Sequence, residues 1–197
     1  MNITIDYYNT NAEKFIDSTV NVDMSSLYDC FVPLLEPGAK ILDVGCGSGR
    51  DSKFFLEKGY KVDAIDATEK FCQLASDYIG QPVKHINVLD LDVTDTYDAI
   101  WACASLLHIE PNNLEKAFLN LRNALKNGGI LYTSFKYGNF AGERNGRYFT
   151  DMTEDSLADL LNRVGGFKFL NQFRTGDVRE GRQSEMWLNV VIKKTND

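Results

Sequence analysis

The sequence predicts a three-layer α/β fold, in which helices cover both faces of one mostly parallel β-sheet. Apolar, β-branched segments alternate along the chain with segments of helical periodicity, and this alternation is typical of successive β–α–β units. A glycine-rich turn joins the first strand to a helix. Near the end of the chain, two strand-like segments follow each other without a helix between them. We therefore expect an antiparallel hairpin at one edge of the sheet.

Seven segments are expected as strands. Five short, apolar segments should form the parallel part of the sheet: 40–44, 61–65, 83–87, 98–102 and 130–135. The last two, 167–174 and 185–193, should form the edge hairpin. They follow Gly165-Gly166, a pair that ends the preceding helix. The sequence thus predicts a seven-stranded sheet.

Helices are expected between these strands and ahead of them. Four alternate with the strands or follow them, over 51–58, 68–78, 112–126 and 153–164. Two others, 5–18 and 23–35, precede the first strand, with Asp23 as the N-cap of the second. We expect one domain over 1–197, with 37–197 as the α/β core. Residues 1–36 form either a helical cover for a sheet edge or a lid over a site.

Composition restricts the class of function. Of 197 residues, 44% are hydrophobic and 25% charged, as in ordinary globular proteins. No apolar run reaches about 18 residues and the first residues do not resemble a secretory signal, so no membrane association is expected. The four cysteines lack metal-ligand spacing, which favours free thiols in a cytoplasmic protein and no metal. A net charge of −7 disfavours a nucleic-acid partner and favours a small-molecule one.

The segment ILDVGCGSGRDS contains the glycines Gly45, Gly47 and Gly49 between a strand and a helix. Such a turn lets the backbone approach a bound cofactor closely. A dinucleotide site would carry a further glycine where this chain has Arg50, and it would keep negative charge away from the pyrophosphate. Asp43 would repel phosphates, whereas it suits the ammonium and sulfonium of S-adenosylmethionine. The turn therefore favours S-adenosylmethionine over a dinucleotide.

Asp66 closes the second strand about 20 residues after the glycines, where an acid accepts hydrogen bonds from ribose hydroxyls in this type of fold. Both a dinucleotide and S-adenosylmethionine contain that ribose. The alternative role for Asp66 is the N-cap of the helix that begins near Ala67.

The motifs DVGCGSGRDS, AIDA and YDAIWACASLLH together resemble the class I S-adenosylmethionine-dependent methyltransferases over residues 38–135. Within that family, GCGSGRDS followed by ASLLH is most similar to the tellurite-resistance and thiopurine-type members, which act on small molecules. The resemblance implies a Rossmann-like sheet, S-adenosyl-L-methionine as cofactor and a methyltransferase that acts on a small acceptor.

The resemblance also implies roles for individual residues in cofactor binding. Asp43 should lie near the methionine amine, Asp66 at the ribose, and Asn87 with Val88 at the adenine, with Asp90 as the alternative adenine contact. Small residues after the fourth strand leave room for the methionine arm, and Cys103 is expected to pack there instead of acting as a nucleophile. The cofactor-binding set is Tyr8, Asp43, Gly45, Cys46, Gly47, Arg50, Asp66, Ala67, Asn87, Val88, Ala102 and Cys103.

His108, at the end of the ASLLH segment, is the candidate catalytic residue. An imidazole titrates near neutrality and can act as general base toward an acceptor that loses a proton. The alternative is a packing role at the rim of the site. Similarly, Tyr7, Tyr8 and Asn11 either close over the cofactor or pack their helix on the core.

Arginines gather in two expected loops near the end of the chain: Arg144 and Arg147 in the first, then Arg174, Arg179 and Arg182. Guanidinium groups bind carboxylates and other oxyanions through a planar fork. Arg144, Arg147 and Arg182 are therefore expected to bind an anionic substrate or the carboxylate of the cofactor. The alternative is ordinary surface pairing with the neighbouring acids Glu143, Asp177, Glu180 and Glu185.

Methyl transfer to a small, anionic molecule is the function that the sequence favours. The acceptor atom stays open among oxygen, nitrogen, sulfur and a metalloid. A protein that binds S-adenosylmethionine without catalysis, as a sensor or partner subunit, is the alternative. A closed acceptor pocket beside the methyl group would favour the enzyme.

Overall fold

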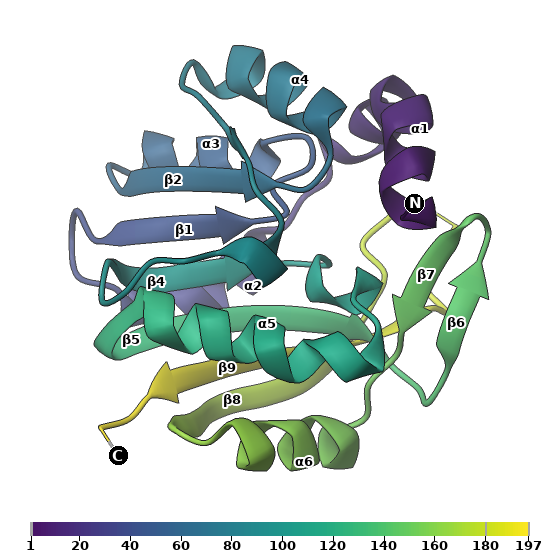
Figure 1. Cartoon of the computed structure of the whole chain (residues 1–197). Helices are drawn as coiled ribbons and strands as arrows, with labels where there is room; N and C mark the ends of the chain where they lie inside the picture. Colours follow the sequence, from purple (N-terminus) through teal and green to yellow (C-terminus); the bar gives the residue numbers. More distant parts are fainter. Residues whose placement is uncertain (1, 180, 197) are drawn as a thin grey trace.

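The central sheet has the strand order β3-β2-β1-β4-β5-β9-β8 in a computed structural model that describes residues 2–179 and 181–196 (Figure 1). Strands β1 to β5 are parallel to one another, whereas β9 runs antiparallel between β5 and β8. The seven-stranded sheet with an antiparallel pair at its edge is thus confirmed. The strands are β1 (Lys40–Val44), β2 (Lys61–Asp66), β3 (Lys84–His85), β4 (Tyr97–Ala102), β5 (Leu125–Lys136), β8 (Phe167–Gly176) and β9 (Met186–Lys194).

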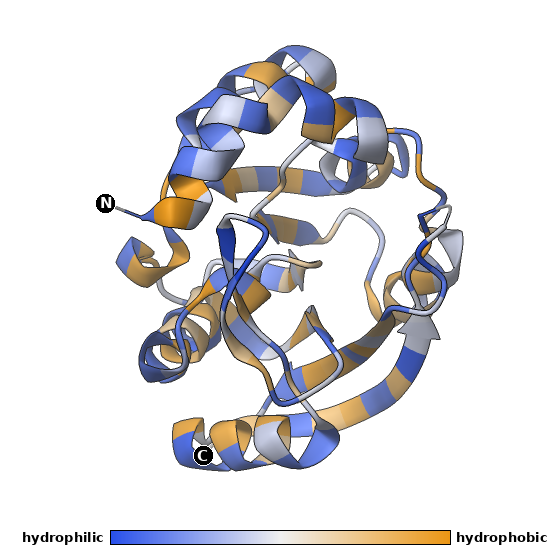
Figure 2. Ribbon diagram, turned by 90° about the vertical axis from the view of Figure 1, so that its right-hand side faces the viewer, coloured by the Kyte–Doolittle hydropathy of each residue, from blue (hydrophilic) through white to orange (hydrophobic). Residues whose placement is uncertain are grey.

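Helices cover both faces of the sheet because its strands alternate in which face each side chain meets. Ile41 and Trp101 pack with Phe31 and Phe55 on one face, whereas Leu42 packs on the other. In Figure 2 the helices carry both hydrophilic and hydrophobic segments, as expected for elements with one buried face. The helices of the α/β core are α3 (Arg50–Glu57), α4 (Glu69–Ile79), α5 (Pro111–Ala124) and α6 (Glu154–Val164).

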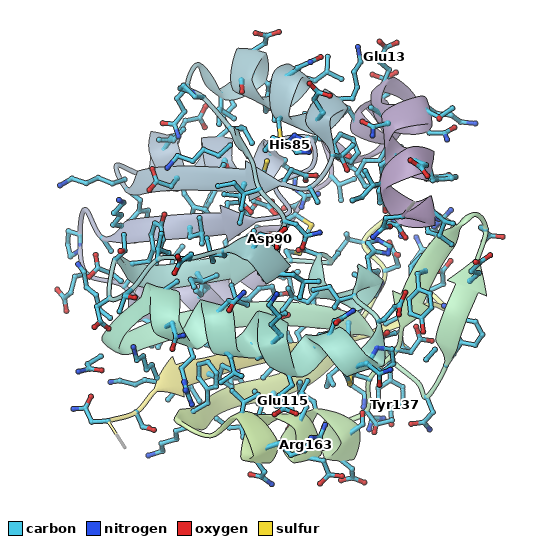
Figure 3. The ribbon with its side chains drawn as sticks, in the orientation of Figure 1. Glu13, His85, Asp90, Glu115, Tyr137 and Arg163 are labelled. Atoms are coloured by element: carbon cyan, nitrogen blue, oxygen red, sulfur yellow. The ribbon has the colours of Figure 1, made fainter. Side chains whose placement is uncertain are left out.

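Helices α5 and α6 lie side by side, and Glu115 and Arg163 face each other between them in Figure 3, forming a 3.6 Å ion pair. The expected strand 83–87 is shorter than predicted, because Asn87 begins a 3₁₀ turn and its side chain accepts a hydrogen bond from the Leu89 amide. Within the described residues, no helix has the length and apolar character needed to cross a membrane.

Two helices precede β1, as predicted: α1 (Ile3–Thr19) and α2 (Ser25–Phe31). The second is shorter than the predicted 23–35. It gives way to a 3₁₀ turn at Val32–Leu34, because Pro33 lacks the N–H that a continuing α-helix needs. The N-cap prediction for Asp23 was wrong. Met24 occupies that position, and Asp23 instead accepts a hydrogen bond from the Ser25 amide.

A second, two-stranded sheet replaces the first of the two expected arginine loops. Its strands, β6 (Ala141–Arg144) and β7 (Arg147–Thr150), are joined by Asn145-Gly146, with φ angles of 52° and 76°. Two successive positive φ angles are typical of a type I′ hairpin turn. In Figure 1, α1 lies between α4 and this hairpin, and the amide of Tyr148 donates to Thr4 Oγ1 over 2.9 Å.

Candidate active site

Two adjoining cavities lie at the carboxyl ends of β1, β2 and β4. The first has a volume of about 610 Å³ and the second about 400 Å³. In open α/β sheets this edge is where ligands bind. The two cavities share part of their walls, so molecules bound in them would lie next to each other. The shared wall residues are Tyr8, Phe15, Gly45, Gly47, Ala104 and His108.

The glycine turn is shaped by close approach of the backbone to its surroundings. Gly45 has a φ of 70°, and a Cβ atom at this position would lie 2.5 Å from Oγ of Ser105. Asp66 holds the turn from below: its two oxygens accept from the amides of Gly47, at 3.0 Å, and Thr68, at 2.8 Å. Burial raises the pKa of Asp66, against the effect of these hydrogen bonds. Because Gly45 and Gly47 have no side chains, the backbone of the turn itself lines both cavities.

The first cavity has the residues that an adenosine needs. Asp66, Ala67, Asn87 and Val88 line it together with the glycine turn. Asp90, the alternative adenine contact, is exposed and lies outside this wall; Figure 3 labels it. The dimensions and donor set of the cavity fit the nucleoside part of S-adenosylmethionine.

Two residues of the predicted cofactor set line neither cavity. Asp43 is 2% exposed and accepts a 2.6 Å hydrogen bond from Ser52 Oγ beneath the turn. Ala102 is fully buried inside β4, and the cavity wall is made by Cys103 and Ala104, the residues that follow it. Ala104 has a φ of 50°, and its amide donates to Ser134 Oγ.

Arg50 lines the second cavity, but its guanidinium is fixed by Asp51. Nε and Nη2 donate to the two carboxylate oxygens over 2.6 and 3.0 Å, and the same carboxylate accepts from Tyr28 and Trp101. Burial alone would raise the pKa of Asp51, but the charge of Arg50 and these hydrogen bonds hold it below its usual value. The sequence prediction did not include Asp51. Its position directly after Arg50, at the end of the glycine motif, was the sequence signal that could have identified it.

A hydrogen-bond chain crosses the boundary between the cavities. Arg147 Nη1 donates to Tyr8 Oη over 3.2 Å, and Tyr8 Oη lies 3.0 Å from His108 Nε2. His108 Nδ1 lies 2.7 Å from the carbonyl oxygen of Tyr148, which can only accept, so Nδ1 carries the proton. Burial, followed by the charges of Arg147 and Lys136, lowers the pKa of His108 to about 4, despite the hydrogen bond to Tyr148. The imidazole is neutral at pH 7, with Nε2 accepting from Tyr8.

The second cavity is bordered by cationic side chains, most of which have carboxylate partners. Arg144 pairs with Asp151 at 2.8 Å, and the second oxygen of that carboxylate lies 3.5 Å away. Arg182 lies 3.9 Å from Glu185 and is half exposed, which corresponds to the alternative of surface pairing with a neighbouring acid. The predicted substrate-binding set did not include two further cations that line this cavity: Lys136, paired with Glu185, and Arg179, which pairs with Asp177.

Arg147 differs from these cations. Among the described residues it has no carboxylate within ion-pair distance, and its Nε is buried without a hydrogen-bond partner. Its guanidinium lies over the rings of Tyr7, Tyr8 and Phe149. Arg174 lies on β8, paired with Glu154 and away from the cavity wall. Glu180, one of the acids considered as a partner, lies outside the described residues.

Apolar side chains also line the second cavity. They come from α1, the segment before α2, α2 itself and the turn after β4: Phe15, Val22, Met24, Leu27 and Leu107. The cavity therefore combines cationic and apolar side chains. That combination fits a compact organic anion.

Comparison with known proteins agrees with this geometry. Residues 42–131 match the family model described as a methyltransferase domain. An uncharacterized methyltransferase of Staphylococcus carnosus is 23% identical over 174 residues, covering 76% of this chain and 84% of that protein. A ubiquinone biosynthesis O-methyltransferase of Rickettsia conorii is 32% identical over 100 residues, covering 48% of this chain and 34% of that protein. This chain thus spans about a third of the length of the Rickettsia protein.

A solved structure with a similar fold is the 1,6-didemethyltoxoflavin-N1-methyltransferase of Burkholderia thailandensis, with bound 1,6-didemethyltoxoflavin and S-adenosylhomocysteine. Its TM-score is 0.77 at 22% identity, covering 98% of this chain and 85% of that chain. At this identity the similarity shows the fold. The glycine turn and the nucleoside-sized cavity agree with the matched domain model: residues 42–131, just under half of the chain, form a methyltransferase domain, and its first cavity fits S-adenosyl-L-methionine as the cofactor.

Proposed function

We propose that this methyltransferase acts on a small anionic acceptor, held in the second cavity with its negative charge at Arg147. In this proposal the glycine turn, Asp66, Asn87 and Val88 hold the adenosine part of the cofactor in the first cavity. When bound, S-adenosylmethionine supplies a methyl group that its sulfonium already activates. The chain itself then has to orient the acceptor and exclude water.

The unpaired guanidinium of Arg147 is the observation that carries the proposal. Arg147 is partly buried, and its Nε is removed from water without a hydrogen-bond partner, which costs free energy; an oxyanion would satisfy both the charge and this Nε. Arg144 and Arg182 already have carboxylates nearby, so they are secondary contributors. The alternative is that Arg147 binds the carboxylate of the cofactor.

The size and shared wall of the second cavity support a small acceptor and an enzyme. About 400 Å³ lies within the usual range for small-molecule pockets. A pocket that adjoins the cofactor cavity favours catalysis over a sensor that only binds the cofactor. The names of the toxoflavin and ubiquinone biosynthesis methyltransferases likewise refer to small acceptors.

The test uses benzoate as an aromatic anion probe and benzamide as its neutral counterpart, titrated calorimetrically in the presence of S-adenosylhomocysteine. The wild type should prefer benzoate, and Arg147→Gln should weaken benzoate binding about tenfold or more while leaving benzamide unchanged. Arg163→Gln, whose side chain pairs with Glu115 far from the cavity, is the matched control. Equal binding of the two probes by the wild type would contradict the proposal. A parallel loss of S-adenosylhomocysteine affinity in Arg147→Gln would assign the arginine to the cofactor carboxylate instead.

A further inference from the structure

The hydroxyl of Tyr8 has one unused hydrogen-bonding position. A phenol oxygen carries one proton and can accept from about two donors. The proton of Tyr8 goes to Nε2 of His108, because Nδ1 of that ring is committed to the Tyr148 carbonyl. One acceptor position is taken by Nη1 of Arg147. The other has no partner among the residues that the structure describes, and Tyr8 lines both cavities at the boundary where the methyl group must pass.

We propose that Tyr8 accepts the proton of the methyl acceptor through this free position and passes its own proton to Nε2 of His108. The proposal rests on the proposed function and deepens it. It also changes the role predicted for each residue. His108 does not touch the acceptor directly, because Tyr8 occupies its only free nitrogen, and Tyr8 becomes a catalytic residue as well as part of the cofactor's cover.

The step balances in atoms and charge. The methyl carbon leaves the sulfonium sulfur, which keeps the bonding electron pair, and bonds to the acceptor atom. That atom loses its proton to Tyr8 Oη, and the original Tyr8 proton moves to His108 Nε2. One positive charge disappears at sulfur while one appears on the imidazole, so the total charge of the site is unchanged.

This charge exchange explains how a histidine with a low pKa can serve as proton acceptor. The charged groups around the Tyr8–His108 pair are Arg147 from β7, Lys136 from β5, Asp66 from β2 and Arg179 from the segment after β8, and the neighbouring titratable group is Tyr7 of α1. Burial and the charges of Arg147 and Lys136 disfavour the imidazolium in the free protein. A bound sulfonium disfavours it further, and conversion of the sulfonium to a thioether removes that repulsion. His108 is therefore a better base immediately after methyl transfer than before it.

The relay narrows the class of acceptor. The reacting atom must carry a proton, as in a hydroxyl or an N–H group, which excludes thioethers, tertiary amines and carboxylate oxygens as acceptors. Because Arg147 and the acceptor share the same phenol oxygen, the anionic group must lie close to the reacting atom. A compact hydroxy acid, or an N–H compound of equivalent shape, meets both conditions.

The test is nitrogen NMR of protein labelled with ¹⁵N-histidine, which observes two rings, those of His85 and His108. In the wild type, His108 should be protonated at Nδ1, and Tyr8→Phe should shift the Nε2 resonance. Tyr7→Phe removes a neighbouring phenol that makes no hydrogen bond to His108, so it should leave that resonance in place. In addition, His108 should bind its proton about tenfold more tightly with S-adenosylhomocysteine than with S-adenosylmethionine.

Three results would overturn the relay: a proton on Nε2, an Nε2 resonance that Tyr8→Phe does not move, or equal pKa values of His108 with the two cofactor forms. Calorimetric titration of Tyr8→Phe with S-adenosylhomocysteine checks that the variant is folded and binds. The benzoate experiment on Arg147 is independent of these readouts. If the anionic-acceptor proposal fails, the histidine resonances should still respond as the relay predicts. If the relay fails, Arg147→Gln should still weaken benzoate binding.

Discussion

Gly45 shows at the scale of one residue why the cofactor turn tolerates no side chain. It combines a left-handed φ of 70° with the close approach of Ser105. Gly59 has a similar φ, 86°, but a Cβ atom there would meet nothing within 4 Å. A comparison of substitutions at the two positions therefore distinguishes the cost of backbone strain from the cost of a steric clash.

We expect Gly59→Ala to lower the free energy of unfolding by about 1–2 kcal/mol, the cost of a left-handed alanine. Gly45→Ala should lower it by more and should also abolish binding of S-adenosylmethionine, because Ser105 or the turn must shift. Urea denaturation and calorimetric titration measure the two effects. Similar unfolding free energies and intact cofactor binding in both variants would show that the contact with Ser105 is unimportant.

The sequence predicted which residues lie at the site better than it predicted their hydrogen-bond partners. Asp66 could be placed at the cavity because the strand end and the glycine turn follow from local patterns, and Asn87 because of the resemblance to a known family. The locking of Arg50 by Asp51 could not, because their geometry depends on Tyr28 and Trp101, which arrive from distant elements. Motifs specify backbone positions, whereas hydrogen-bond partners depend on tertiary packing.

At the scale of elements, α1 is the part of the chain that both cavities depend on. It contributes Tyr8 and Phe15 to their shared wall and contacts both α4 and β7. The role of residues 1–36 as a lid stays a prediction, to which this position gives support.

Deletion of residues 1–20 should weaken S-adenosylmethionine binding about tenfold or more, because one wall of the first cavity is lost. Calorimetric titration provides the measurement, with circular dichroism to verify the remaining fold. Glu13→Gln is the matched control: this α1 side chain points outward in Figure 3 and makes only a 3.8 Å contact with Lys70. Unchanged affinity for S-adenosylmethionine after the deletion would show that α1 only covers the sheet edge.

The β6–β7 hairpin is the element that sequence reasoning missed. Its strands are short and largely polar, so they lack the apolar alternation that identified the others. Asn145-Gly146 was the usable signal, since this dipeptide favours a two-residue hairpin turn. The strands of the main sheet were found because most of them are apolar enough to be recognised locally; β3, the exposed pair Lys84–His85, was found only as part of a longer expected segment. The sequence predicted a hairpin at the sheet edge, but it did not predict that β9 enters between β5 and β8.

At the scale of the whole molecule, the buried carboxylate of Asp43 and the partly exposed carboxylate of Asp63 should give opposite dependences of stability on pH. Burial, followed by the charge of Asp51, raises the pKa of Asp43 above its usual range. Its folded form therefore binds a proton more tightly than its unfolded form. This contribution to stability is complete below about pH 4 and is lost as the pH rises through the folded pKa.

Asp63 behaves in the opposite way, because hydrogen bonds from Lys40 and Tyr97 outweigh burial and lower its pKa. Its contribution is present above about pH 4 and is lost as the pH falls. Urea denaturation between pH 3 and pH 8 should show that Asp43→Asn removes a decline of stability toward high pH, while Asp63→Asn removes a decline toward low pH. Parallel pH profiles in the two variants would contradict this assignment.

The position of β9 has a consequence for biosynthesis. Strand β8 is made before β9, yet it joins the sheet only through β9, which also pairs with β5. While the ribosome is still adding residues 186–194, both β5 and β8 present unpaired edges that can recruit other chains. The nascent protein therefore passes through an aggregation-prone interval that ends only when its final strand emerges, and chaperones that bind exposed edges would act in that interval.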